Sequence, residues 1–180
     1  ENIKLHKKAN ELLFKLDDDE DWITHNEFHI NWDYFSFYTE GAMQAVDCKS
    51  LLDRIAIKKD YSEVMLIDIK TTGNVNDFKE SFNKYDYGRQ MAFYWQAIEY
   101  YLEEELELTE EQISKIKRTT YIIAIGSNNE IKVYKIDPEL ISERNSIISE
   151  TISKITWHNS TNKWDYSKEY YEGDGSEILE

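Results

Sequence analysis

The stretch Leu66–Thr72 constrains the fold of this chain more strongly than any other. It reads LIDIKTT, a run of apolar and β-branched residues that ends at the turn signal Gly73-Asn74, and this pattern is typical of a β-strand. Because side chains alternate along a strand, Asp68 and Lys70 are expected on one face and the isoleucines on the other. An acid and a base placed in this way form either an ordinary weak ion pair at a strand end or part of a reactive site.

Hydrophobic periodicity predicts the other elements. Apolar residues at helical spacing predict helices over 2–16, 89–106 and 138–155, with a short helix within 74–87. Strand patterns predict a first strand over 28–34, with 34–39 as its continuation or as a hairpin arm. Further strands are predicted over 44–49, 51–58, 64–71, 121–125 and 131–136. Those before residue 72 are typical of an antiparallel meander with a turn at Glu40-Gly41, and the last two of a hairpin. This order predicts an α/β (α+β) fold with a central mixed β-sheet flanked by helices.

A single domain is expected over residues 1–180. The length is sufficient to bury a core, and one proline and six glycines leave no linker that would divide the chain. We expect the core to span about 2–155 and an aromatic, acidic tail to span 156–180. The sequence begins at Glu1 rather than Met, so we also expect that an N-terminal piece is missing or was removed.

Composition excludes several classes of protein. No apolar run reaches membrane-spanning length and no signal peptide precedes the first helix, so no membrane partner is expected. The single Cys48 excludes an internal disulfide, a four-cysteine zinc site and a cysteine-ligated iron–sulfur cluster. A cytoplasmic location is the resulting expectation.

The net charge of −15 argues against nucleic acid as a partner, because phosphate binding normally needs a basic surface. The charge is unevenly distributed, however. Residues 49–89 contain eight basic and seven acidic side chains, so this segment carries +1 while the remainder carries −16. The segment that contains Asp68 and Lys70 is therefore the part of the chain that repels a polyanion least.

Asp53 lies within the predicted strand 51–58. It either pairs with a basic neighbour, Arg54 or Lys49, or it converges with Asp68 of the next strand on one divalent metal. Hard cations such as Mg²⁺ prefer oxygen ligands and commonly use one or two carboxylates, with waters and substrate phosphate completing the shell.

Two further groups fit such a site. The backbone carbonyl of Ile69 lies between Asp68 and Lys70 and is a candidate third oxygen ligand. Lys70, on the same face as Asp68, would orient or deprotonate an attacking water whose pKa the metal lowers. The residues thus suggest Mg²⁺ or Mn²⁺ as the cofactor.

Three segments together resemble the PD-(D/E)XK nuclease superfamily: AVDCKSLLDRI, LIDIKTT and DFKESFNKYDYGRQMAFY. The chain looks most like the exodeoxyribonuclease VIII (RecE-like) and phage recombination exonuclease branch. The resemblance is clear over 45–101 and weaker through the last helix. It implies a restriction-endonuclease-like core in which Asp53, Asp68 and Lys70 are the catalytic residues.

The resemblance also implies a helix that borders the active site. Gln90 and Tyr94 match the family's Q-x-x-x-Y motif and lie one helical turn apart, so they face the same way. In the family this helix is thought to touch the DNA or to brace the catalytic lysine, and the neighbouring Arg89 is a further candidate for substrate binding. The alternative for Gln90 and Tyr94 is simple core packing.

The chain departs from the family at two places. Leu52 stands where the motif has proline, which is a common loss. The family branch also uses a histidine on an upstream helix as a metal ligand, and His6 is the candidate because it alone of the four histidines lies on a convincing helix. Glu40 is a rival for this role, His25 and His29 are weaker candidates, and packing or simple exposure is the alternative for His6.

The expected function is therefore that of a metal-dependent deoxyribonuclease. The resemblance implies an exonuclease on duplex DNA ends in recombination or phage DNA metabolism, within a bacterial or phage-infected cell. DNA is the expected partner, alongside a single-strand annealing or other recombination protein, and a homo-oligomer could enclose the DNA. Two alternatives stay open. One is a catalytically inactive nuclease-fold module for protein assembly or DNA-end binding, and the other is a structure-selective endonuclease or an RNA nuclease.

Overall fold

A five-stranded β-sheet with the order β1-β2-β3-β4-β5 forms the centre of the protein, whose computed structural model describes residues 2–39 and 42–176. The strands are β1 (Trp22–Thr39), β2 (Ala42–Lys58), β3 (Glu63–Thr72), β4 (Lys117–Gly126) and β5 (Ile131–Ile136). Strand β2 runs antiparallel to both β1 and β3, β4 runs parallel to β3, and β5 is antiparallel to β4. The predicted mixed sheet flanked by helices, an α+β fold, is confirmed.

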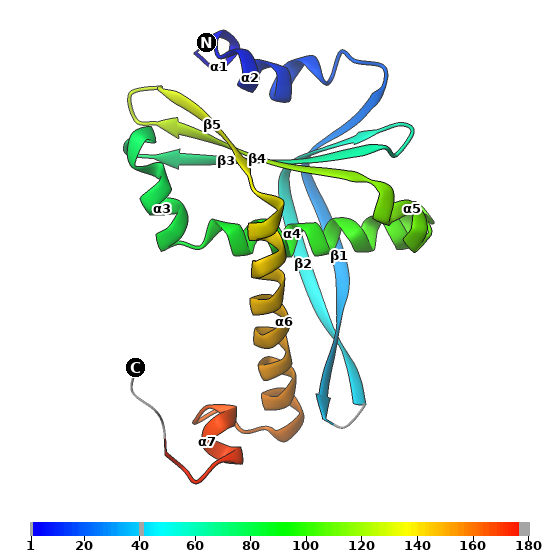
Figure 1. Ribbon diagram of the computed structural model, residues 1–180, viewed down its shortest axis with the longest axis vertical. Coiled ribbons are helices and arrows are strands. Elements are labelled where there is room, and N and C mark those ends of the chain that lie inside the picture. The colour runs from blue at the N-terminus through cyan, green and yellow to red at the C-terminus, as the bar shows by residue number, and fades with distance from the viewer. Residues whose placement is uncertain (1, 40–41, 177–180) are drawn as a thin grey trace.

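Helices cover both faces of this sheet (Figure 1). The first face carries α1 (Asn2–Leu5), α2 (Lys7–Asn10) and the π-helical turn η1 (Glu11–Lys15). On the second face lie α3 (Phe78–Lys84), α4 (Tyr87–Tyr100) with its extension η3 (Tyr101–Glu105), α5 (Glu110–Lys115) and the long α6 (Pro138–Thr161). A short 3₁₀ turn, η2 (Val75–Asp77), precedes α3, and α7 (Lys168–Glu172) lies beyond the foot of α6.

The alternation of side chains along β3 divides the core into two layers. Met65 and Ile67 pack with Ala9 and Leu12 under the N-terminal helices. Leu66 belongs to the larger cluster that contains the buried residues of α4. Because Asp68 and Lys70 follow Leu66 at intervals of two, they lie on the α4 side of the sheet.

Several predicted boundaries are wrong. The predicted helix 2–16 is interrupted at His6, whose backbone is extended (φ −79°, ψ 109°). The predicted strands 44–49 and 51–58 are one strand, because Ser50 is buried and its hydroxyl accepts a hydrogen bond from the indole N–H of Trp32 (3.1 Å). The predicted turn at 40–41 lies outside the described residues.

Within the described ranges, none of the helices has the length and apolar composition needed to cross a membrane.

Candidate active site

The candidate site lies where β2 and β3 separate. Their ladder runs from Ile57 opposite Val64 to Arg54 opposite Ile67 and ends there. One residue further along β2, the Asp53 carboxylate oxygen Oδ2 accepts a hydrogen bond from the backbone N–H of Ile69 at 2.7 Å. A side chain thus takes the place of the strand backbone, and the sheet opens at this point.

Ile69 also directs its carbonyl group into this opening. In an antiparallel ladder the N–H and C=O of one residue face the same neighbouring strand. Since the N–H of Ile69 reaches Asp53, its carbonyl oxygen faces the β2 side as well, beyond the end of the ladder. The carbonyl predicted as a ligand therefore lies on the side of β3 where Asp53 is found.

Asp68 is the most unusual residue of the site. It is only 1% exposed, and its Oδ2 has no hydrogen-bond donor among the residues that the structure describes. The ammonium nitrogen of Lys70 lies 2.7 Å from this oxygen and forms an ion pair with it. Burial raises the pKa of Asp68 to about 6 despite the opposing Lys70, and the negative charge of Asp53 acts in the same direction as burial.

Lys70 is held on its other side by an aromatic ring. Its ammonium nitrogen lies 5.0 Å from the ring centroid of Tyr87, within the range of a cation–π interaction. Sequence reasoning assigned no role to Tyr87, although its position three residues before Gln90 places both on one side of α4. That spacing was the signal that could have identified it.

Asp86 fixes the beginning of α4. This non-glycine residue adopts the left-handed conformation (φ 47°, ψ 52°), and its side chain caps the helix by accepting a hydrogen bond from the N–H of Arg89. The guanidinium Nε of Arg144 on α6 donates to the same carboxylate at 2.7 Å. Asp86 therefore couples α6 to the helix end that carries Tyr87.

Gln90 and Tyr94 interact directly, as their spacing suggested. The amide Nε2 of Gln90 donates to the Tyr94 hydroxyl at 2.8 Å. Burial raises the pKa of Tyr94, and the nearby charges of Asp68 and Asp53 add to this, so the hydroxyl keeps its proton. Arg89, the third predicted substrate-binding residue, has a side chain that is 52% exposed and makes only a loose 3.6 Å contact with Asp86.

The alternative interpretation of Asp53 as the partner of Arg54 is wrong. Adjacent residues of a strand point to opposite faces, and Arg54 is buried under the N-terminal helices. Its guanidinium donates to the carbonyl of Leu12 (2.9 Å), to Asn26 (2.7 Å) and to Asp17 (2.6 Å). The Asp53 carboxylate instead accepts the hydrogen bond from the N–H of Ile69, and its negative charge acts on Asp68.

His6 does not lie with the acidic pair. The helix α2 packs through Ala9 on the face of the sheet that carries Ile67, opposite to the face of Asp68. The His6 Nδ1 accepts a hydrogen bond from the N–H of Ala9 (3.2 Å) and caps α2. The prediction of His6 as a ligand is corrected by this placement, and the rival Glu40 lies outside the described residues.

The remaining donors fit a hard divalent cation. Residues 2–39 and 42–176 contain no group of three or more His, Cys, Asp or Glu side chains that could hold a metal. What the site offers is two carboxylates and a backbone carbonyl, a set of oxygen ligands that suits Mg²⁺ or Mn²⁺ when waters and phosphate complete the shell. The buried Oδ2 of Asp68 without a hydrogen-bond donor is the atom that such a cation would satisfy.

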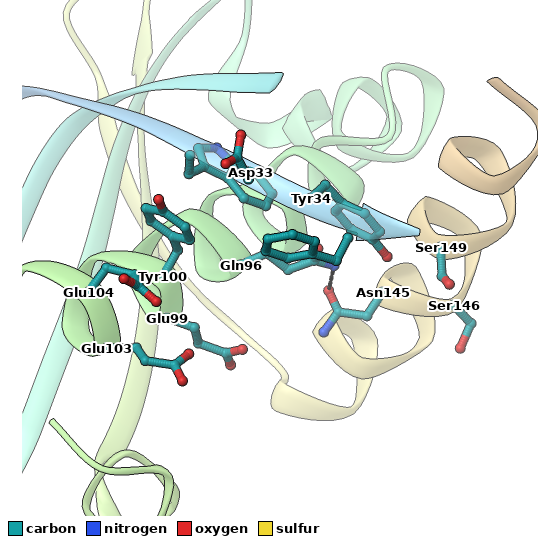
Figure 2. Close-up of a pocket in the computed structure, with 12 residues that line it drawn as sticks. Asp33, Tyr34, Gln96, Glu99, Tyr100, Glu103, Glu104, Asn145, Ser146 and Ser149 are labelled. Carbon is teal, nitrogen blue, oxygen red and sulfur yellow. Dashed lines mark hydrogen bonds between the residues drawn. The ribbon is translucent and has the colours of Figure 1, made fainter. Parts of the chain in front are cut away.

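A large cavity lies elsewhere, between β1, the second half of α4 and α6 (Figure 2). Its volume is about 710 Å³, and none of the site residues lines it. Gln96 donates a hydrogen bond to Asn145 across it (3.0 Å), and four carboxylates surround it: Asp33, Glu99, Glu103 and Glu104. This concentration of negative charge disfavours a phosphate backbone, so the cavity is no candidate for the DNA path.

Comparison with known proteins adds a likeness of shape. No protein-family model matches the chain, and no curated protein matches it in sequence. Among solved structures, the chain is similar to the crystal structure of a "Putative exonuclease" from Eubacterium rectale, with a TM-score of 0.48 and 12% sequence identity. The match covers 97% of this chain and 61% of that protein, so the chain spans less than two thirds of its length.

Proposed function

We propose that this protein is a metal-dependent deoxyribonuclease that hydrolyses DNA phosphodiester bonds at the site of Asp53, Asp68 and Lys70. The observation that carries the proposal is the buried Oδ2 of Asp68, which has an ion-pair partner but no hydrogen-bond donor in the described parts of the chain. Burying a carboxylate oxygen without a hydrogen-bond donor costs folding free energy. Acidic groups with pKa values perturbed by burial are concentrated at functional sites, and this supports a functional role for Asp68.

Each residue of the site has a task in this proposal. Asp53 and Asp68 provide carboxylate oxygens, and the Ile69 carbonyl provides a third, for Mg²⁺ or Mn²⁺. The bound cation would lower the pKa of water and neutralise charge on the phosphoryl oxygens. Lys70 orients the attacking water through its ammonium group, which Tyr87 keeps beside Asp68.

Gln90 and Tyr94 are proposed to line the path of the DNA backbone. Because the Tyr94 oxygen accepts from Gln90, its own proton is free to donate to a phosphate oxygen or to the acidic pair. The exposed Arg89, whose contact with Asp86 is loose, can reach phosphate without breaking a strong ion pair.

More specifically, we propose that the protein acts as an exonuclease on duplex DNA ends in recombination or phage DNA metabolism. It rests on the resemblance of the three sequence segments. The same proposal includes products that carry 5′-phosphates. It also includes a single-strand annealing or other recombination protein as partner, and a homo-oligomeric state. A basic partner or a ring of subunits would offset the net charge of −15, which otherwise weakens DNA binding.

The test is cleavage of end-labelled linear duplex DNA with Mg²⁺, with Mn²⁺ and with a chelator. The wild-type protein should release labelled nucleotides only with a metal. Lys70→Ala should lower the rate by about 100-fold or more, and Asp68→Ala should abolish activity. Lys49→Ala, which removes an exposed lysine of β2, is the matched control and should keep the wild-type rate.

A closed circular duplex distinguishes the classes of nuclease. An exonuclease leaves it intact, whereas a structure-selective endonuclease cuts substrates that have no ends. Failure of the wild-type protein to cleave any DNA with either metal, or equal cleavage by Lys70→Ala, would contradict the proposal.

A further inference from the structure

An exposed aromatic ring lies close to the site and has no part in the chemistry described above. Tyr85 follows α3 directly and precedes the cap of α4, and it is 58% exposed. Single exposed aromatic residues are common on protein surfaces and need no explanation. Tyr85 differs from such residues in how its ring is supported.

The ring of Tyr85 is the outer end of a stack that begins in the core. It lies 5.8 Å from the ring of Tyr87, which lies 6.0 Å from Phe78, and Phe78 lies 5.2 Å from Tyr134. Phe78 is only 2% exposed. Contacts between rings at these distances are favourable, so Tyr87 supports the exposed ring of Tyr85 from its inner side.

Cationic groups flank this ring. The ammonium nitrogen of Lys84 lies over the face of the Tyr85 ring, 5.3 Å from its centroid, and the exposed Arg89 lies one turn further along α4. On the inner side, Tyr87 is shared between Tyr85 and the ammonium group of Lys70. Because Lys84 has a long side chain, a base that stacks on this face can displace its ammonium group toward a phosphate. Together with the lysine of the candidate site, which lies one ring away, the Tyr85 ring forms a surface suited to a nucleotide.

We propose that Tyr85 is a stacking platform for an unpaired nucleobase next to the phosphodiester that is cut. This inference rests on the proposed function and narrows its substrate to DNA with a single-stranded or opened end. A base inside a duplex has both faces covered by its neighbours, whereas an unpaired base offers a face to a tyrosine. The stacked base would place its phosphates near Lys84 and Arg89 and leave the next phosphate for Lys70.

The test uses single-stranded oligonucleotides that carry the fluorescent base 2-aminopurine at successive positions from each end. The measurements are made in a chelator, so that binding is observed without cleavage. Wild-type protein should quench the fluorescence at one end position, because stacking on an aromatic ring quenches this base. Tyr85→Ala should lose that quenching and bind about tenfold more weakly, while Tyr85→Trp should keep both.

Two controls make the result specific. Tyr166→Ala removes a similarly exposed ring (53%) in the C-terminal segment and should behave as wild type. An oligonucleotide with an abasic site at the quenched position should bind wild-type and Tyr85→Ala protein with the same affinity. Since Tyr85 is exposed, its removal should leave the melting temperature almost unchanged, and this confirms that the variant is folded.

Failure of this inference can be told apart from failure of the proposed function. Metal-dependent cleavage together with identical quenching and affinity in wild-type and Tyr85→Ala protein would overturn the stacking platform and leave the nuclease proposal standing. Quenching that depends on Tyr85 without cleavage in any metal would support the platform and contradict the nuclease. Absence of oligonucleotide binding by the wild-type protein would overturn the platform.

Discussion

Oδ2 of Asp68 and the ammonium nitrogen of Lys70 lie 2.7 Å apart at a position where Asp68 is 1% exposed. Lys70 is the ion-pair partner of this oxygen, and no other described residue donates a hydrogen bond to it. Lys70 therefore compensates the buried charge incompletely, and burial still raises the pKa of Asp68 to about 6. A divalent cation beside Asp53 and Asp68 would provide the compensation that the protein alone does not.

The pH dependence of stability follows from this carboxyl group. Its folded pKa of about 6 lies above the ordinary value of 3.8, so the folded state binds more protons between these values. The contribution of Asp68 to stability is complete below about pH 4 and is lost as the pH rises through 6, by about 3 kcal/mol. In a chelator, Asp68→Asn should therefore be more stable than wild type at pH 8 but not at pH 4, as measured by urea unfolding.

Asp60 provides a control for the direction of this pH effect on stability. The pKa of the exposed Asp60 is held below its usual value by the hydroxyl and N–H of Ser62. The Asp60 contribution is thus present at neutral pH and lost as the pH falls through its folded pKa. Asp60→Asn should shift stability in the opposite direction to Asp68→Asn. If the difference in unfolding free energy between the wild type and Asp68→Asn does not vary with pH, the raised pKa assigned to Asp68 is contradicted.

Tyr87 should act on the rate through Lys70. Tyr87→Leu removes the ring that lies 5.0 Å from the ammonium nitrogen, a contact worth about 1–2 kcal/mol when partly desolvated. We expect kcat for cleavage to fall about tenfold with little change in KM, whereas Tyr87→Phe should keep nearly the full rate because the ring remains.

A control within the same ring stack separates this effect from general loosening. Tyr134→Leu removes a ring that stacks on Phe78, and no contact links Tyr134 to Lys70 in the described structure. Tyr134→Leu should lower the free energy of unfolding while leaving kcat close to the wild-type value. Equal losses of kcat in Tyr87→Leu and Tyr87→Phe would show that the hydroxyl, rather than the ring, is the important group.

Arg54 should be the main polar contributor to stability on the opposite face. It is 1% exposed and donates to Leu12, Asn26 and Asp17, so Arg54→Met leaves three acceptors without their donor. The expected loss is about 3 kcal/mol of unfolding free energy. Arg118→Met, which removes a half-exposed ion pair with Glu99, should cost less than about 1 kcal/mol in the same urea titration.

Local pattern predicted most of the elements but not their interruptions. The strand 131–136 agrees with β5, and the strand 64–71 lies within β3, because both carry unbroken apolar or alternating patterns. The hydrophobic pattern did not predict the break in the first helix, because the break depends on a hydrogen bond from the N–H of Ala9 to the His6 ring. The parallel pairing of β4 with β3 is likewise set by the crossover through α4, which no local pattern encodes.

The site itself was predictable only where strand geometry fixes it. Spacing of two placed Asp68 and Lys70 on one face, whereas Asp53, one residue beyond the last paired residue Arg54, was assigned to the site through the family resemblance. The hydrogen bond from Ile69 to Asp53 and the position of Tyr87 over Lys70 depend on how the ladder ends and how α4 begins. These are tertiary features, and periodicity does not contain them.

The most direct test of a divalent metal held by Asp53 and Asp68 is a calorimetric titration of the protein with Mn²⁺. The wild-type protein should bind about one ion with measurable heat, and Asp53→Asn and Asp68→Asn should each lose that heat while staying folded. Asp47→Asn, which changes an exposed carboxylate of the same strand, should bind as wild type does. Absence of heat in the wild type, or the same heat in Asp68→Asn, would contradict the account.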